Sequence, residues 1–197
     1  MARYDEAEMK ARLARLDRSQ KTAFAAACAE RLWPLFERYS EATGRGYVAA
    51  LRVALDSVWR AARDEQVADL AGARQVAEGM VPSDEGEWIF EMGYGQNTAA
   101  AVAYAVRTWL TDDPQEGAWG VLQLYEAADY AARRSLPDLD LDAPDAEQRL
   151  LASRVVQDAL AGMSTDLMTV ESPTGDRWET LQQLARQEGE AWALSLP

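Results

Sequence analysis

The chain contains no histidine and a single cysteine, Cys28, and this limits the chemistry open to it. Without histidine, Ser–His and Cys–His nucleophiles, His-ligated zinc sites and imidazole acid–base pairs are excluded. One cysteine forms neither an internal disulfide nor a cysteine-rich metal cluster, and its place on an apolar helical stripe predicts a buried small side chain. Catalysis would need carboxylates, arginine, tyrosine or lysine, and no motif identifies a catalytic residue, a metal site or a cofactor.

Glycines and amides interrupt an apolar region at residues 93–105, which read GYGQNTAAAVAYA. The spacing fails the G-x-G-x-x-G fingerprint, and no strand precedes it, so nucleotide binding is not expected. We expect the glycines to bend the chain between two helical segments, with Asn97 capping the second and the alanines allowing a neighbouring helix to approach. The alternative is a polar pocket around Tyr94, Gln96 and Asn97.

Five residues are candidates for binding a small ligand or for carboxylate-based catalysis. They are Glu30, Glu91, Tyr94, Gln96 and Asn97. Two of them carry carboxylates, and the other three carry hydroxyl or amide groups that could orient a bound molecule.

Glu188 is the candidate for a buried charge. It lies seven positions after Leu181 and four before Trp192, so helical geometry places it within the apolar stripe of the last helix. A buried carboxylate must be paired or must raise its pKa, and we expect an ion pair with an arginine from another helix. A frayed, exposed helix end and a functional carboxylate are the alternatives. Burial predicts that Glu188→Ala costs far more stability than Glu190→Ala.

The acidic loop at Asp138, Asp140 and Asp142 resembles the start of a calcium-binding loop. Its sixth position is Ala143, where the turn needs glycine, and its twelfth is Arg149, where a bidentate glutamate is needed. We therefore interpret the segment as a solvated acidic loop.

Length and composition predict a single soluble domain over residues 1–197, with 48% hydrophobic residues. Residues 1–21 lack the apolar centre of a secretory signal, and the apolar runs are shorter than the roughly 20 residues that cross a bilayer. We expect a cytoplasmic protein that does not enter a membrane. Its abundant alanine and arginine are typical of a bacterial genome rich in G and C.

The net charge of −13 is unevenly distributed along the chain. Residues 1–46 carry nine basic and seven acidic groups, a balance of +2, whereas residues 111–197 carry six and seventeen, a balance of −11. Such acidity repels a phosphate backbone, so we expect no nucleic-acid partner. It favours solubility or attraction to a basic protein partner.

Hydrophobic periodicity is helical throughout and predicts an all-α, single-domain bundle of seven to eight helices. The second, third, fifth and sixth helices should form the core. Asp17 and Gln20 form a capping box for the long second helix, which contains Pro34 and ends at Gly44. Start signals at 82–85 and at Asp176 predict further helices, and residues 136–144 form the clearest loop before a helix near 145–163.

These segments resemble the bacterial YjaG-like family, known as domain of unknown function 416. The residues that carry the resemblance are Phe24, Glu30, Arg31, Pro34, Tyr39, Thr43, Gly44, Gly46, Asp56, Trp59, the segment 81–85, Gln96, Asn97 and Tyr104. The resemblance covers most of residues 12–135, departs from the family pattern at Gly95 and Thr98, and is poor in the acidic helices of 136–197. It implies an all-helical cytoplasmic bacterial protein without an established activity, linked to sensor-kinase signalling by gene neighbourhoods.

Together, the missing catalytic groups and the asymmetric charge predict a non-catalytic protein-interaction or regulatory module, signalling-associated or immunity-like, with a basic protein partner. A small-ligand binder or a carboxylate-based enzyme, with its pocket near Tyr94, Gln96 and Asn97, is the alternative. A homodimer is a further expectation, because helical domains with several exposed tryptophans often self-associate.

Overall fold

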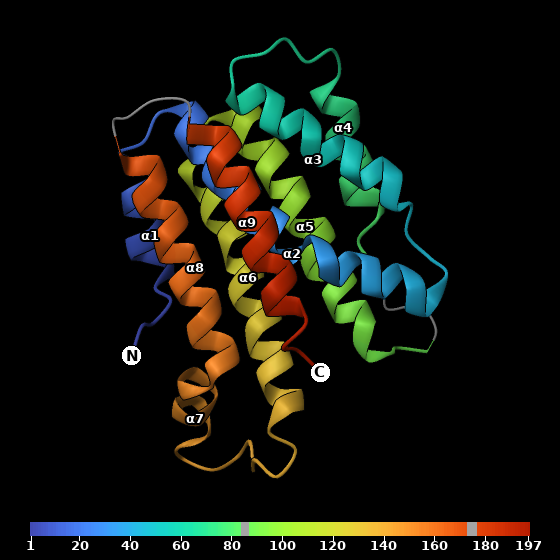
Figure 1. Cartoon of the computed structure of the whole chain (residues 1–197), viewed down its shortest axis with the longest axis vertical. Helices are drawn as coiled ribbons and strands as arrows, with labels where there is room; N and C mark the ends of the chain where they lie inside the picture. The colour runs from blue at the N-terminus through green and yellow to red at the C-terminus, as the bar shows by residue number, and fades with distance from the viewer. Residues whose placement is uncertain (84–86, 173–176) are drawn as a thin grey trace.

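The computed structural model describes residues 1–83, 87–172 and 177–197, and this part of the chain contains nine helices and no strand (Figure 1). The all-α prediction is confirmed, but the predicted seven to eight helices are too few. The helices are α1 (Glu6–Leu13), α2 (Arg18–Thr43), α3 (Val48–Ala62), α4 (Leu70–Gly79), α5 (Phe90–Thr111), α6 (Pro114–Ser135), α7 (Ala146–Ala152), α8 (Arg154–Glu171) and α9 (Arg177–Ala193).

The long helix α2 lies at the centre of the bundle and contacts α3, α5, α6, α8 and α9 (Figure 1). Every residue from Lys21 to Trp33 is buried, so the helix is enclosed on all sides. Alanines within 23–29 keep its surface narrow and allow the surrounding helices to approach. The sequence had indicated one apolar stripe on this helix, because periodicity alone does not show that the opposite face is covered too.

Local signals set the ends of several helices, and the predicted capping box at Asp17 and helix end at Gly44 are confirmed. The Asp17 carboxylate accepts a hydrogen bond from Gln20 N, and the Gln20 side chain bonds the Asp17 backbone, which completes the capping box. Gly44 ends α2 in the left-handed conformation, with φ of 64°. The Asp113 side chain caps α6, whose first residue is Pro114.

The predicted bend in the 93–105 stretch is wrong. α5 runs unbroken from Phe90 to Thr111, so Gly93 and Gly95 lie inside the helix and Asn97 caps nothing. The predicted start at 82–85 falls partly outside the described residues, at Asp84 and Glu85. In the described part, the helix begins only at Phe90.

The C-terminal helices also differ from the prediction. The single helix expected near 145–163 is two helices, because Ser153 adopts an extended conformation and its hydroxyl accepts a hydrogen bond from Val156 N to cap α8. The cap predicted at Asp176 lies outside the described residues. Buried apolar side chains from every described helix join one hydrophobic core.

No helix in the described ranges is both long enough and apolar enough to cross a membrane.

Candidate functional site

A groove of about 750 Å³ lies where α5, α6 and α7 meet, and Gln96 and Asn97 of α5 form part of its wall. The loop between α6 and α7 contributes Leu141, and Trp88 lies just before α5. We call this feature the acidic groove. Its lining residues are Trp88, Gly93, Gln96, Asn97, Tyr125, Glu126, Asp129, Tyr130, Arg133, Leu141, Ala146, Glu147 and Leu150.

Gly93 allows Tyr130 of α6 to reach the groove. A Cβ atom at residue 93 would lie 2.6 Å from Tyr130 Cε1, so any larger residue would displace this ring. Tyr130 stacks on Phe90, with ring centroids 4.5 Å apart, and Tyr94 meets both rings edge-on. Tyr94 is fully buried and packs against the Tyr130 ring, and it does not line the groove. The expected role of Tyr94 as a groove residue is therefore not seen.

The groove carries an excess of negative charge. Glu126, Asp129 and Glu147 contribute three carboxylates against the single guanidinium of Arg133. Arg133 already donates a hydrogen bond of 2.8 Å to Asp129. Partial burial and the neighbouring charge of Asp129 raise the pKa of Glu126 above its ordinary value of 4.5, as expected for a carboxylate without a cation.

Several polar groups at the groove have no partner in the described part of the chain. Asn97 is 9% exposed as a whole residue, and its side-chain amide, which makes no hydrogen bond to any described residue, remains accessible at the groove. The same is true of the Gln96 amide, the Tyr130 hydroxyl and the Glu126 carboxylate within the described ranges. These groups reach the groove with free hydrogen-bonding capacity, so a ligand seated there could bond to them.

Glu30 lies apart from the groove, inside the bundle. Its carboxylate is fully buried and accepts hydrogen bonds from Arg52, from the Trp59 indole and from Arg186. Burial by itself would raise the pKa of Glu30, but the bonds and charges of Arg52 and Arg186 outweigh it and lower the pKa below 4.5. All of its partners belong to the chain, so Glu30 is a structural residue in this arrangement.

Glu91 lies in the first turn of α5 and does not line the groove. An acidic residue there interacts favourably with the positive end of the helix dipole. Of the five candidates, the structure therefore brings together only Gln96 and Asn97.

The prediction that Glu188 is buried is wrong, because its side chain is 45% exposed. The adjacent Gly189 is the residue that faces the core. The expected arginine partner is present: Arg31 of α2 lies 2.6 Å from the Glu188 carboxylate. With this exposure, Glu188→Ala should cost no more than one charge-assisted hydrogen bond, rather than the penalty of an unpaired buried charge.

The acidic loop is exposed to solvent, and the Asp140 carboxylate accepts a hydrogen bond from Asp142 N. Within the described ranges, no three Asp, Glu, Cys or His side chains come together in a way that could hold a metal ion. The loop adds negative charge beside the acidic groove.

The sequence did not identify the groove residues on α6. Tyr125 is only partly buried and lines the groove. A signal was available: residues 125, 129 and 133, and likewise 126 and 130, recur at four-residue spacing, which places polar and aromatic groups along one helix face.

The seven tryptophans gave a misleading signal, because Trp88 alone among them is exposed. The main reason to expect a homodimer is therefore lost.

Comparisons with known proteins agree with this fold. The family model described as "Protein of unknown function (DUF416)" matches residues 8–190. The chain is also similar to a crystal structure of a DUF416 family protein from Shewanella baltica OS155, with a TM-score of 0.78, 18% identity and coverage of 92% of this chain and 93% of the other. The comparison with curated proteins gave no match. The family match extends well beyond residues 12–135, so the acidic helices belong to the family pattern after all.

Proposed function

The chain belongs to the DUF416 family of proteins of unknown function, and from this premise we propose that it is a non-catalytic interaction module that binds a basic segment of a partner protein in the acidic groove. A single observation carries the proposal: uncommitted carboxylates and an accessible amide without a hydrogen bond to any described residue line the same aromatic groove. Catalysis receives no comparable support, since the buried carboxylate Glu30 is fully engaged by partners within the chain.

The chemistry of the groove favours a guanidinium or ammonium group. Carboxylates of Glu126 and Glu147 would pair with the cation, and Trp88, Tyr125 and Tyr130 offer aromatic faces for cation–π contact. The Asn97 amide would then bond a backbone carbonyl or N–H of the partner. A linear basic segment suits the groove because the exposed acidic loop at 138–142 extends the negative charge beyond it.

A free cationic metabolite is the second candidate. The unpartnered Asn97 amide favours it, because an amide next to carboxylates can orient a small amine as well as a peptide. The two candidates differ in how much of the acidic loop they would contact.

The test is calorimetric titration with a short peptide of alternating glycine and arginine, and with the same peptide carrying citrulline in place of arginine. We expect the arginine peptide to bind at low salt and to weaken at moderate salt, and the citrulline peptide not to bind. Binding of spermidine but not of the arginine peptide would instead favour the metabolite.

A matched pair of double variants locates the interaction. Glu126→Gln with Glu147→Gln removes two charges from the groove, whereas Glu41→Gln with Glu190→Gln removes two exposed charges from α2 and α9. The groove variant should lose about tenfold or more in affinity, and the control should retain most of it. Equal losses in both variants would mean that only the overall charge attracts the peptide.

A further inference from the structure

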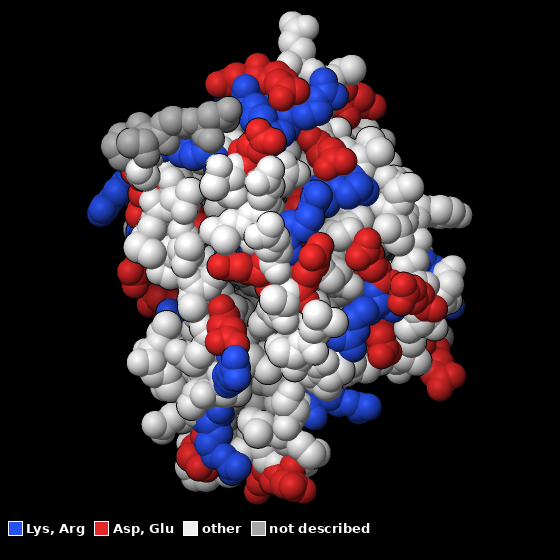
Figure 2. Space-filling view, viewed as in Figure 1, with Lys and Arg blue, Asp and Glu red and all other residues white. Residues whose placement is uncertain are grey.

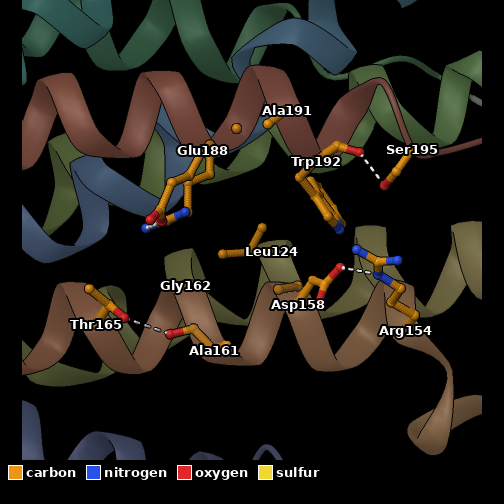
Figure 3. A pocket seen from close by; sticks show the side chains of 13 residues that line it. Leu124, Arg154, Asp158, Ala161, Gly162, Thr165, Glu188, Ala191, Trp192 and Ser195 are labelled. Carbon is orange, nitrogen blue, oxygen red and sulfur yellow. Dashed lines mark hydrogen bonds and ion pairs between the residues drawn. The ribbon is translucent and has the colours of Figure 1, made fainter.

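A second cavity, of about 360 Å³, lies between α8 and α9 and is separate from the acidic groove (Figure 3). Glu188 and Trp192 project into it from α9, and Leu124 of α6 lies at its floor (Figure 3). Alanines and glycines of α8 and α9 form much of the remaining wall. The cavity therefore combines an apolar interior with two groups of charges, Arg31 with Glu188 and, further along α8, Arg154 paired with Asp158 at 3.3 Å (Figure 3).

The first charged group centres on Arg31, whose side chain is only 6% exposed. Its Nε and Nη2 atoms donate hydrogen bonds of 2.6 and 2.8 Å to the two carboxylate oxygens of Asp166, which is fully buried. Nη2 also lies 2.6 Å from Glu188. Nη1 donates no hydrogen bond to a described residue.

Arg31 reaches the cavity wall because residue 162 has no side chain. A Cβ atom at Gly162 would lie 2.7 Å from Arg31 Nη1, so the guanidinium rests directly against the backbone of α8. Nη1 is thus held next to the cavity, where it could donate a charge-assisted hydrogen bond to an incoming anion.

The two carboxylates on Arg31 differ in their freedom to move. Asp166 is fully buried and bidentate, so it is fixed, and its charge alone balances that of the arginine. Glu188 is 45% exposed and lies at the cavity, so its carboxylate can turn into solvent at little cost. Glu188 thus occupies a position on Arg31 that an incoming carboxylate could take.

We propose that this cavity binds the carboxylate of a small organic acid with an apolar or aromatic body, and that the ligand displaces Glu188 from Arg31. The carboxylate would accept hydrogen bonds from Nη1 and Nη2 of Arg31. The apolar body would lie against Leu124 and the Trp192 ring, whose indole N–H is already bonded to Val155 O and needs no further partner. The site does not depend on the function of the acidic groove.

Benzoate and its uncharged analogue benzamide are the probes for this site, used with the full chain. Glu188→Gln removes the competing charge, and Glu190→Gln is its control, because Glu190 is an exposed glutamate two positions further along α9 and does not line the cavity. Arg31 itself is left intact, since its removal would leave Asp166 buried without a partner. Calorimetry gives the affinities, and the NMR signal of the Trp192 indole N–H reports the location.

We expect Glu188→Gln to bind benzoate at least about tenfold more tightly than the wild type, Glu190→Gln to match the wild type, and benzamide not to bind. The Trp192 signal should shift as benzoate saturates the site. Absence of any gain in Glu188→Gln, equal binding of benzamide, or benzoate binding that leaves the Trp192 signal unmoved would each overturn the proposal.

Discussion

Two neighbouring residues of opposite charge, Glu30 and Arg31, join the central helix to α9. Arg186 of α9 donates a hydrogen bond of 3.0 Å to Glu30, and Glu188 of the same helix lies 2.6 Å from Arg31. Charges inside a protein are tolerated only when paired, and each of these two is also held by a second helix, α3 for Glu30 and α8 for Arg31. The pairs therefore fix how α3, α8 and α9 sit around α2.

Glu30→Gln should destabilise the fold by about 2 kcal/mol at neutral pH, because Arg52 and Arg186 would lose a charged hydrogen-bond acceptor inside the bundle, although Arg52 keeps its ion pair with Asp56. The pKa of Glu30 is lowered in the folded state, so its carboxylate contributes fully above its ordinary pKa of 4.5 and loses that contribution as the pH falls through the lowered folded value. Urea unfolding at several pH values should show the gap between wild type and variant narrowing below pH 4.5.

The exposed Glu41→Gln serves as the control, with little change in stability expected. A gap between the wild type and Glu30→Gln that stays constant into strongly acidic solution would contradict this account of the pair.

At the scale of the elements, the glycines of α5 allow close packing against its neighbours. A Cβ atom at Gly95 would lie 2.5 Å from the ring of Tyr39, which is itself buried in α2. Glycine tolerates this approach of α5 to α2, and the tertiary contact outweighs the cost of glycine within a helix.

Gly95→Ala should therefore lower the free energy of unfolding by about 2 kcal/mol through overpacking against Tyr39. Gly79→Ala is the matched comparison, since no atom lies within 4 Å of a Cβ at that helical position. There the better helix propensity of alanine should leave stability unchanged or raise it by up to about 1 kcal/mol. Thermal or urea unfolding of both variants distinguishes them, and a neutral Gly95→Ala would refute the packing argument.

The ends of the helices could be predicted from the sequence where neighbouring residues determine them. The predictions failed where packing between distant segments determines the structure. The capping box at Asp17 and the turn at Gly44 follow from backbone hydrogen bonding, which neighbouring residues determine. The glycines of 93–105 suggested a bend when only their own segment was considered. Their actual role is to make room for the rings of Tyr39 and Tyr130, which are distant in sequence and so could not be identified from this segment. Likewise, Gln96 and Asn97 could be singled out from their own segment, but the carboxylates and rings that complete the groove come from α6 and α7.

At the scale of the whole molecule, the excess of acidic over basic side chains is not spread evenly over the surface. On the face that presents α3, α8 and α9, acidic and basic side chains are interspersed (Figure 2). The acidic groove differs from this pattern in having three carboxylates for one guanidinium, beside an exposed acidic loop. A basic partner steered by the net charge of −13 would find its specific contacts there.

The most direct test of the central claim is an NMR titration that follows the side-chain amide of Asn97 and the indole N–H of Trp88 as the arginine peptide is added. If the groove binds the basic segment, both signals shift and saturate together, whereas the Trp192 indole, which lines the other cavity, stays unchanged. Peptide binding that leaves Asn97 and Trp88 unmoved, or no binding at low salt, would contradict the account.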